Sequence, residues 1–520
     1  MANRKLFTSA TKYGSPADTL NSEIAPAYTL EDRAALSQLV TTGCLNNTFY
    51  IGGGEQLDWI LDCAQRVDSE FIAKAALYAR TNGFMKDTPA LLLAILATRE
   101  KPWLEKAFDR VIDNGKMLRN FCRIIRSGKV GRKSFGTRVK RLICNRINAV
   151  SDYSLFSWSV GNDPSLADIL KMVHPKPTTV SKEALFGYLL GKENLSQNLP
   201  SIVQAYEDFK KDTSLTPPNV PFQMIASLNL GDSVWKEIAK NAKWTMTRMN
   251  LNTFARHGVF NDEQLTQLIA NRIRNRDEVL EARAFPYQLM VAYLHADENV
   301  PLEVQNAIQD AMEIATENVP VLEGNVYVFV DVSGSMAGAL TGYRGSATTV
   351  VRCVDVASLF ASALLRKNSN TTVWPFNGDV LPCNLNSRDS VITNANKLAN
   401  LCTNGTNISA PLAKLNKLNK KADLVIYLSD NESWMDGPSC YRYNNATASS
   451  AEWTNLKRRC PNAKLVCINL TPAPHSQVKE RKDVYNIGGF SDEIFSLIYA
   501  ISRNEMNTKH WIGEIEKVVL

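Results

Sequence analysis

The sequence lacks a hydrophobic segment long enough to cross a membrane. Its longest apolar run, Pro89 to Ala97, is about half of the ~18 residues that a spanning helix needs. The N-terminus carries basic residues but no apolar stretch before a small-residue cleavage pattern, so we expect no secretory signal. Ten cysteines and five histidines include no Cys-x-x-Cys and no His-x-x-x-His pair. These absences argue against a structural zinc site and favour reduced thiols in the cytoplasm.

Acidic residues are missing from one part of the chain. The whole sequence has 59 basic and 52 acidic residues, but positions 101–150 hold 14 basic and three acidic ones. No acid occurs between Lys116 and Arg146. Because such a segment attracts polyanions, RNA or DNA is the expected partner. The rest of the composition, 45% hydrophobic and 21% charged, is globular, and 520 residues predict at least two domains.

The first 320 residues have the pattern of successive amphipathic helices. Apolar residues recur at helical spacing in 58–65, 70–80 and 88–97, and Thr29 is a plausible helix N-cap. Alternating β patterns are absent from this half. Helix pairs at intervals of roughly 35 to 45 residues favour stacked HEAT-type repeats, and a plain helical bundle is equally compatible with the pattern.

The pattern changes near residue 320 to short β-branched and aromatic runs separated by helical stretches such as 347–367. The expected strands are 326–330, 371–374, 424–428, 465–469 and 484–487. Strands alternating with helices predict a parallel, doubly wound α/β sheet, whose ligands bind beyond the carboxyl ends of the strands. We therefore expect an α-helical domain over 1–320 and an α/β domain over 321–520.

A candidate metal site follows the first of these strands directly. Asp331, Ser333 and Ser335 place a carboxylate and two hydroxyls at alternate positions of a turn, and Gly334 permits the bend. Such oxygen ligands can converge on one hard divalent cation. Magnesium fits a set with few charges best, and manganese and calcium are the alternatives.

Two further loops complete a recognisable pattern. Thr403–Asn407 contains Thr406, and Asp430 follows the strand 424–428. With the first loop they resemble the metal-ion-dependent adhesion site of von Willebrand factor A domains. The resemblance implies metal ligation by Thr406 and Asp430, an open position for an acidic group of a protein partner, and no hydrolysis. A phosphatase would need a basic phosphate clamp or carboxylates for a second metal beside Asp331, and the sequence offers neither.

The helical half carries several strings that resemble the TROVE module of the Ro autoantigen family. They are 43–50, 219–225, 234–237, 249–253 and 285–289, and the A-domain opening 329–336 fits the same family. The resemblance, closest to the bacterial type, implies a monomeric ring of HEAT-like helix pairs closed by the A domain. It further implies a non-enzymatic scaffold that binds Y-like small noncoding RNA outside, takes single-stranded 3′ ends of misfolded RNA into a basic central hole, and works with an exoribonuclease.

The basic segment supplies the candidate RNA contacts. On a helix from about Thr137, we expect Arg138, Lys140 and Arg141 on a polar face, where they would meet phosphates without reading sequence. A solvated helix face is the alternative. The resemblance adds His174 and Lys176 from its His-x-Lys-Pro string. The full expected RNA-binding set is Arg132, Lys133, Arg138, Lys140, Arg141, Arg146, His174 and Lys176.

Some features weaken or oppose the RNA interpretation. Residues 156–163 lack the basic residues that the family commonly has there, which lessens the expectation of Y RNA binding. His257 is as compatible with a helix end as with the hole. Nearby aromatics are expected in the core, namely Phe121, Phe135, Tyr153, Phe156 and Trp158. The main rival is a metal-dependent, protein-binding A domain whose helical half is a spacer; a nuclease lacks the paired acids it would need.

Overall fold

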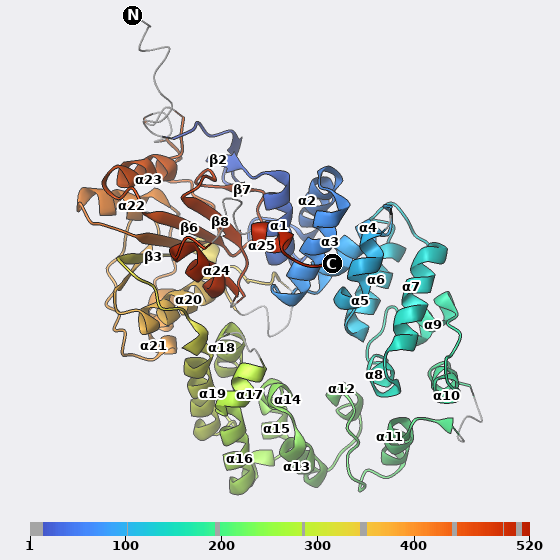
Figure 1. Cartoon of the computed structure of the whole chain (residues 1–520). Coiled ribbons are helices and arrows are strands. Elements are labelled where there is room, and N and C mark those ends of the chain that lie inside the picture. Colours follow the sequence, from blue (N-terminus) through green and yellow to red (C-terminus); the bar gives the residue numbers. More distant parts are fainter. Residues whose placement is uncertain are drawn as a thin grey trace, which may run out of the picture.

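The structure, a computed structural model, describes residues 14–100, 102–192, 198–282, 286–343, 351–438, 442, 445–491, 493–505 and 512–520. A helical half comes first and an α/β half second, as predicted (Figure 1). None of the helices in these ranges combines the length and apolar character needed to span a bilayer.

The helical half is a succession of short helices. Each buries an apolar stripe against its neighbours: α6, for example, turns Met117, Phe121 and Ile125 inward with no exposure. Contacts run between near neighbours, such as α3 with α4, α4 with α6, and α16 with α19, which is the pattern of stacked helices. The helices are α1 (Asp32–Thr42), α2 (Gly53–Arg66), α3 (Ser69–Thr81), α4 (Asp87–Leu96), α5 (Trp103–Val111), α6 (Gly115–Arg126), α7 (Gly136–Ala149), α8 (Asp152–Ser157), α9 (Leu166–Val173), α10 (Val180–Leu189), α11 (Ser201–Lys211), α12 (Phe222–Ile225), α13 (Asp232–Asn241), α14 (Trp244–Met249), α15 (Leu251–Arg256), α16 (Glu263–Ile273), α17 (Arg276–Glu281), α18 (Pro286–Leu294) and α19 (Leu302–Ala315).

The α/β half is a five-stranded sheet with the order β4-β3-β5-β6-β8, parallel throughout. All five predicted strands are confirmed, as β3 (Val326–Asp331), β4 (Thr371–Phe376), β5 (Leu424–Ser429), β6 (Lys464–Asn469) and β8 (Val484–Gly488). Every residue of β3, β5 and β8 is buried, because helices cover both faces of the sheet. These helices are α20 (Cys353–Lys367), α21 (Val391–Ala399), α22 (Ser409–Lys417), α23 (Ala448–Arg459) and α24 (Glu493–Ser502), and α25 (Ile512–Glu516) follows. The helix expected over 347–367 is α20, and positions 344–350 lie outside the described residues.

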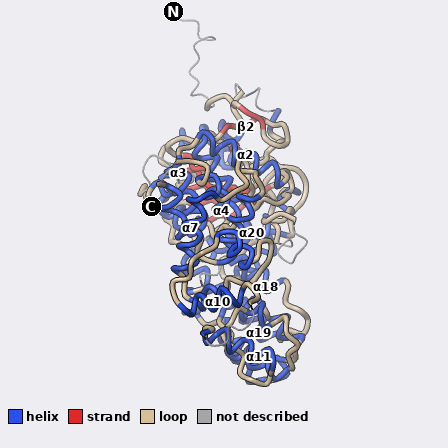
Figure 2. The backbone as a smooth tube through the Cα atoms, turned by 90° about the vertical axis from the view of Figure 1, so that its right-hand side faces the viewer, coloured by secondary structure: helices blue, strands red, loops and turns tan. Residues whose placement is uncertain are grey.

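Both ends of the helical half rest on the α/β half. Near its start, the Thr41 hydroxyl of α1 donates a hydrogen bond to the Gly488 carbonyl of β8, at 3.1 Å. At its end, Glu313 of α19 accepts from the Val391 backbone N–H of α21 at 2.7 Å and lies 3.4 Å from Arg366 of α20. The helices therefore form a ring that the α/β half closes (Figure 1). In the side view, strands occupy the upper part of the molecule and α10, α11 and α19 the lower part (Figure 2).

The N-terminal segment corrects two expectations. Thr29 is not a helix N-cap: it ends strand β2 (Pro26–Thr29), and α1 begins at Asp32 with Glu31 in the cap position. The first half also contains strands, because β2 pairs with β1 (Thr19–Leu20) and with β7 (His475–Ser476) of the α/β half. Strand β7 lies more than 400 residues from β2 in sequence, so no local sequence pattern could predict this pairing.

One buried amide contributes to the joint between the two halves. The Asn368 side chain accepts from the Leu322 N–H at 2.7 Å and donates to the Pro320 carbonyl at 3.0 Å. We expect Asn368→Ala to lower the free energy of unfolding by about 2 kcal/mol, because both backbone groups lose their partner. Urea denaturation followed by circular dichroism measures this. Asn384→Ala, at an exposed position, is the control, and equal stabilities of the two variants would contradict the assignment.

Candidate functional site

Three loops of the α/β half meet at the carboxyl end of the sheet. Asp331 ends β3, the turn after it carries Ser333 and Ser335, and Asp430 follows β5. Backbone hydrogen bonds join the first loop to the second, from Gly334 N–H to the Asn404 carbonyl at 2.7 Å and from Thr403 N–H to the Val332 carbonyl at 2.8 Å. The five predicted ligand residues, Asp331, Ser333, Ser335, Thr406 and Asp430, are all at most 7% exposed.

Hydrogen bonds fix the two carboxylates of this cluster. Asp331 accepts from the Ser333 N–H at 2.9 Å and from the Ser429 hydroxyl at 2.6 Å. The hydroxyls of Ser333 and Ser335 lie 3.2 Å apart. Asp430 accepts from the Glu432 N–H through Oδ1 at 3.3 Å, whereas its buried Oδ2 has no hydrogen-bond partner. A buried carboxylate oxygen without a partner is costly, which suits a position facing a cation.

The electrostatics of the cluster also suit a cation. Burial raises the pKa of the Asp331 carboxyl, and burial followed by the charge of Asp331 raises the pKa of Asp430 well above its usual range. Among the described residues, no lysine or arginine lines the cavity beside Asp430. In the described ranges, no three His, Cys, Asp or Glu side chains gather as a metal cluster, so this ligand set depends on hydroxyls beside its two carboxylates.

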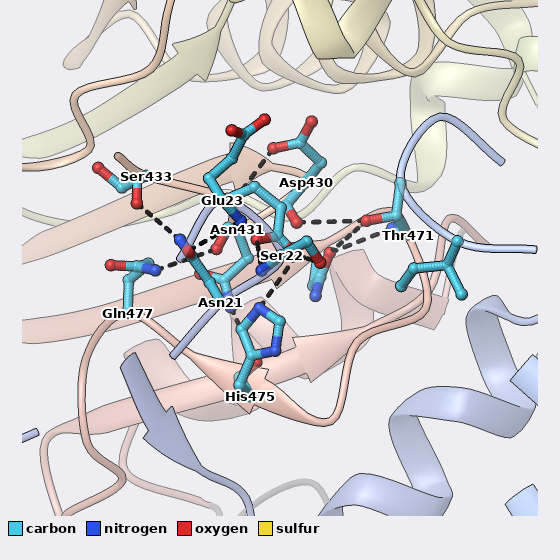
Figure 3. Close-up of polar contacts among 12 residues, drawn as sticks. Asn21, Ser22, Glu23, Asp430, Asn431, Ser433, Thr471, His475 and Gln477 are labelled. Atoms are coloured by element: carbon cyan, nitrogen blue, oxygen red, sulfur yellow. Dashed lines mark hydrogen bonds and ion pairs between the residues drawn. The ribbon is translucent and has the colours of Figure 1, made fainter. Parts of the chain in front are cut away.

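The N-terminal segment reaches the same edge, which sequence reasoning did not foresee. Ser22 donates to the Glu432 carboxylate through its N–H at 2.8 Å and its hydroxyl at 2.9 Å. The buried His475 ring lies 3.0 Å from the same carboxylate, and the Asn21 amide donates to the Ser433 carbonyl at 2.6 Å. Figure 3 shows Asn21 and Ser22 among the side chains of Asp430, Ser433 and His475. This network ties β1 and β2 to the candidate metal site.

The expected basic helix is α7. Val139, Ile143 and Ile147 are buried, because they share the face turned toward the ring's core. On the opposite side Arg141 is exposed and Lys140 half-buried. Neither makes an ion pair with any acid of the described residues. Both cations are therefore available to an anion from outside.

Three of the residues predicted to contact RNA form bonds within the protein. Arg138 forms an ion pair with Glu105 at 2.8 Å and donates to the Arg99 carbonyl. Arg132 donates to the carbonyls of residues 97, 134 and 135, and Arg146 donates to the Ile112 carbonyl. Glu105 precedes the acid-free segment by 11 residues, so the segment's composition did not reveal this pair.

The remaining predicted contacts are exposed. His174 is the left-handed C-cap of α9, with φ of 54°, and its side chain is exposed like those of Lys133 and Lys176. The Asn148 amide of α7 donates to the Lys176 carbonyl at 2.8 Å, which holds the end of α9 against α7. We call the exposed or half-exposed set Lys133, Lys140, Arg141, His174 and Lys176 the α7–α9 basic surface.

Residues near the basic surface bear on three further expectations, which concern segment 156–163, the aromatic residues and His257. Arg123 donates to the Asp163 carbonyl and pairs with its carboxylate at 2.8 Å, so the acid-containing segment 156–163 engages part of the basic charge. Four of the five aromatics are buried as expected, but Tyr153 is 44% exposed, because it lies on the outer side of the short helix α8. His257 stacks on Trp235 with ring centroids 4.3 Å apart, at a helix end.

Two family models match adjoining parts of the chain. The TROVE domain family matches residues 222–324, and the Ro60 vWA domain family matches the adjoining residues 325–501. A crystal structure of the Ro (RSR) protein of Deinococcus radiodurans is similar in fold, with a TM-score of 0.62 at 18% sequence identity. That similarity covers 92% of this chain and 100% of the Deinococcus chain.

The geometry of the cluster predicts a specific loss on substitution. Asp331→Ala should abolish binding of Mg²⁺ or Mn²⁺, since it removes one of the two carboxylates of the set. Titration of Mn²⁺, followed by the electron paramagnetic resonance signal of the free ion, measures the affinity. Asp389→Ala, which removes a carboxylate paired with Lys397 on the surface, should bind the ion as the unaltered protein does. Retention of affinity by Asp331→Ala would contradict the ligand set.

Proposed function

The chain belongs to the Ro family, in which a TROVE domain is joined to a von Willebrand factor A domain, and we propose that it is a non-enzymatic RNA-binding scaffold of the cytoplasm. The observation that carries the proposal is the α7–α9 basic surface. Lys140 and Arg141 project from α7 and have no acidic partner in the described part of the chain, and the other three cations lie in the segments that flank α7 and α9. A plain solvated helix face would be expected to mix both signs of charge.

The basic surface suits the phosphate backbone of a structured RNA. Lysine, arginine and exposed histidine side chains on α7 and on the segments beside α7 and α9 can neutralise several phosphates, which gives affinity and position but little sequence discrimination. A small noncoding, Y-like RNA is the proposed ligand of this outer surface. Because Arg132, Arg138 and Arg146 are engaged with the protein, the proposal assigns them the role of holding the helices.

A cavity on the inside of the joint supports the second part of the proposal. It has a volume of about 340 Å³ and lies where the two ends of the helical half face the A domain. Lys86 and Lys116 line it with Phe84, which is 39% exposed. Cations beside an aromatic ring are what single-stranded nucleic acid requires. We assign this cavity to the single-stranded 3′ ends of misfolded RNA, which an exoribonuclease partner would then degrade.

The A domain is proposed to hold a divalent ion, Mg²⁺ before Mn²⁺ or Ca²⁺. Asp331 and Asp430 with the hydroxyls of Ser333, Ser335 and Thr406 would hold it, and its charge would offset the buried carboxylates. No hydrolytic role is assigned to it. The ring closes within one chain, so the proposal includes a monomer. The rival, a protein-binding A domain with a helical spacer, predicts no RNA binding at all.

The outer surface has a direct electrostatic test. Replacing Lys140 and Arg141 together with Ala should weaken binding of structured RNA of any sequence. It should also flatten the slope of log K against log salt by about 0.7 to 0.9 for each phosphate that the variant no longer neutralises. Filter binding at several salt concentrations measures both. The matched control replaces the exposed Lys417 and Lys420 of the A domain, and an unchanged slope in the first variant would contradict the proposal.

The proposed role of the cavity is tested with RNAs that differ only at their 3′ end. An RNA with a single-stranded 3′ tail should bind more tightly than the same duplex with blunt ends, since only one strand is expected to enter the ring. Lys116→Ala should reduce this preference, because Lys116 is exposed at the cavity, and Lys417→Ala should leave it unchanged. Equal affinities for tailed and blunt RNA would remove the 3′ end from the proposal.

A further inference from the structure

The loop between α1 and α2 belongs to the helical half but packs on the A domain beside the candidate metal site. The Asn46 amide donates to the Thr341 carbonyl at 3.1 Å, and the Tyr343 N–H donates to the Asn47 carbonyl at 2.9 Å. Both A-domain residues come shortly after the turn that carries Ser335. The loop 46–51, which we call the capping loop, is therefore held against the first metal-binding loop by hydrogen bonds that run in both directions.

Glycines in the A domain make this close approach feasible. A Cβ at Gly338 would lie 3.0 Å from the Cβ of Phe49. A Cβ at Gly342, where φ is +73°, would lie 2.7 Å from the Cβ of Asn46. Only a residue without a side chain fits at that second position, both because of the contact and because of the left-handed backbone. The A-domain surface is thus shaped to receive the capping loop.

Tyr50 brings the capping loop into the metal site itself. Its side chain lines the same small cavity as Ser335 and Asp430. A tyrosine hydroxyl keeps its proton at neutral pH, because its ordinary pKa is about 10. A neutral hydroxyl is an oxygen of the same kind as those of the serine and threonine ligands.

The space left around Tyr50 is small. The cavity lined by Tyr50, Ser335 and Asp430, together with Phe49, Gly338 and Glu432, has a volume of about 10 Å³. This is about the least that holds one water molecule. A carboxylate side chain of another protein would therefore not fit in this cavity while the capping loop is in place.

We propose that the capping loop is the internal partner of the A-domain ion site, with Tyr50 on the side where A domains usually receive an external acidic group. Ion binding and docking of the loop are then linked, so each favours the other by the same factor. A bound ion would therefore stabilise the contact between the helical ring and the A domain. We call this linkage between ion binding and loop docking the latch. The inference rests on the ion site proposed above and is independent of the RNA proposal.

The first test compares ion affinities. Tyr50→Phe removes only the hydroxyl and should weaken Mn²⁺ binding about fivefold, the effect of losing one net hydrogen bond. Asn46→Ala should weaken it as well, although Asn46 touches none of the proposed ligands, because its amide holds the loop. Tyr343→Phe, which removes an exposed tyrosine hydroxyl beside the same loop, should bind Mn²⁺ as the unaltered protein does.

The second test follows the docking of the loop. Mg²⁺ should slow amide hydrogen exchange at Tyr343, whose N–H bonds to the capping loop, and should have no such effect in Asp331→Ala. If the unaltered protein binds no divalent ion, the ion site and the latch both fail. If it binds the ion, but Tyr50→Phe binds equally tightly and exchange at Tyr343 does not respond, the latch alone is wrong.

Discussion

The architecture depends on the closure of a helical array onto one parallel sheet. Stacked short helices bury their apolar stripes only on their neighbours, so an open array would leave two terminal faces unpaired. Here both terminal faces rest on the A domain, through α1 against β8 and through α19 against α20 and α21. The A domain thus acts as the cap of both ends. One chain forms a ring whose outer surface and inner joint present different chemistry.

Closure also determines where the ion site lies. The carboxyl end of a parallel sheet is the usual place for a ligand, and closing the ring brings two segments of the helical half to that end. Ser22 bonds to Glu432, and Tyr50 lines one cavity with Ser335 and Asp430, so the candidate site is an interface within the molecule. Two buried carboxylates at such an interface are unfavourable without a cation, and for this reason we propose that a divalent ion stabilises the joint between the halves.

Much of this could be predicted from local sequence patterns. The five buried strands, the turn after β3 and the inward face of α7 follow from residue periodicity and from the position of polar residues at strand ends. The long-range features could not. The pairing of β2 with β7, the ion pair of Arg138 with Glu105 and the approach of Tyr50 to Ser335 each join segments that are distant in sequence. The prediction that Tyr153 is buried was wrong, because helix α8 is too short for its apolar residues to define a periodicity.

The central claim is that this protein binds RNA. Sequencing the RNA that copurifies with the untagged, full-length protein tests it most directly. The account predicts a small set of discrete structured RNAs, together with RNAs that carry single-stranded 3′ extensions, enriched well above their cellular abundance. Recovery of no RNA beyond what an unrelated protein of similar net charge retains would contradict the account and favour a protein-binding A domain with a helical spacer.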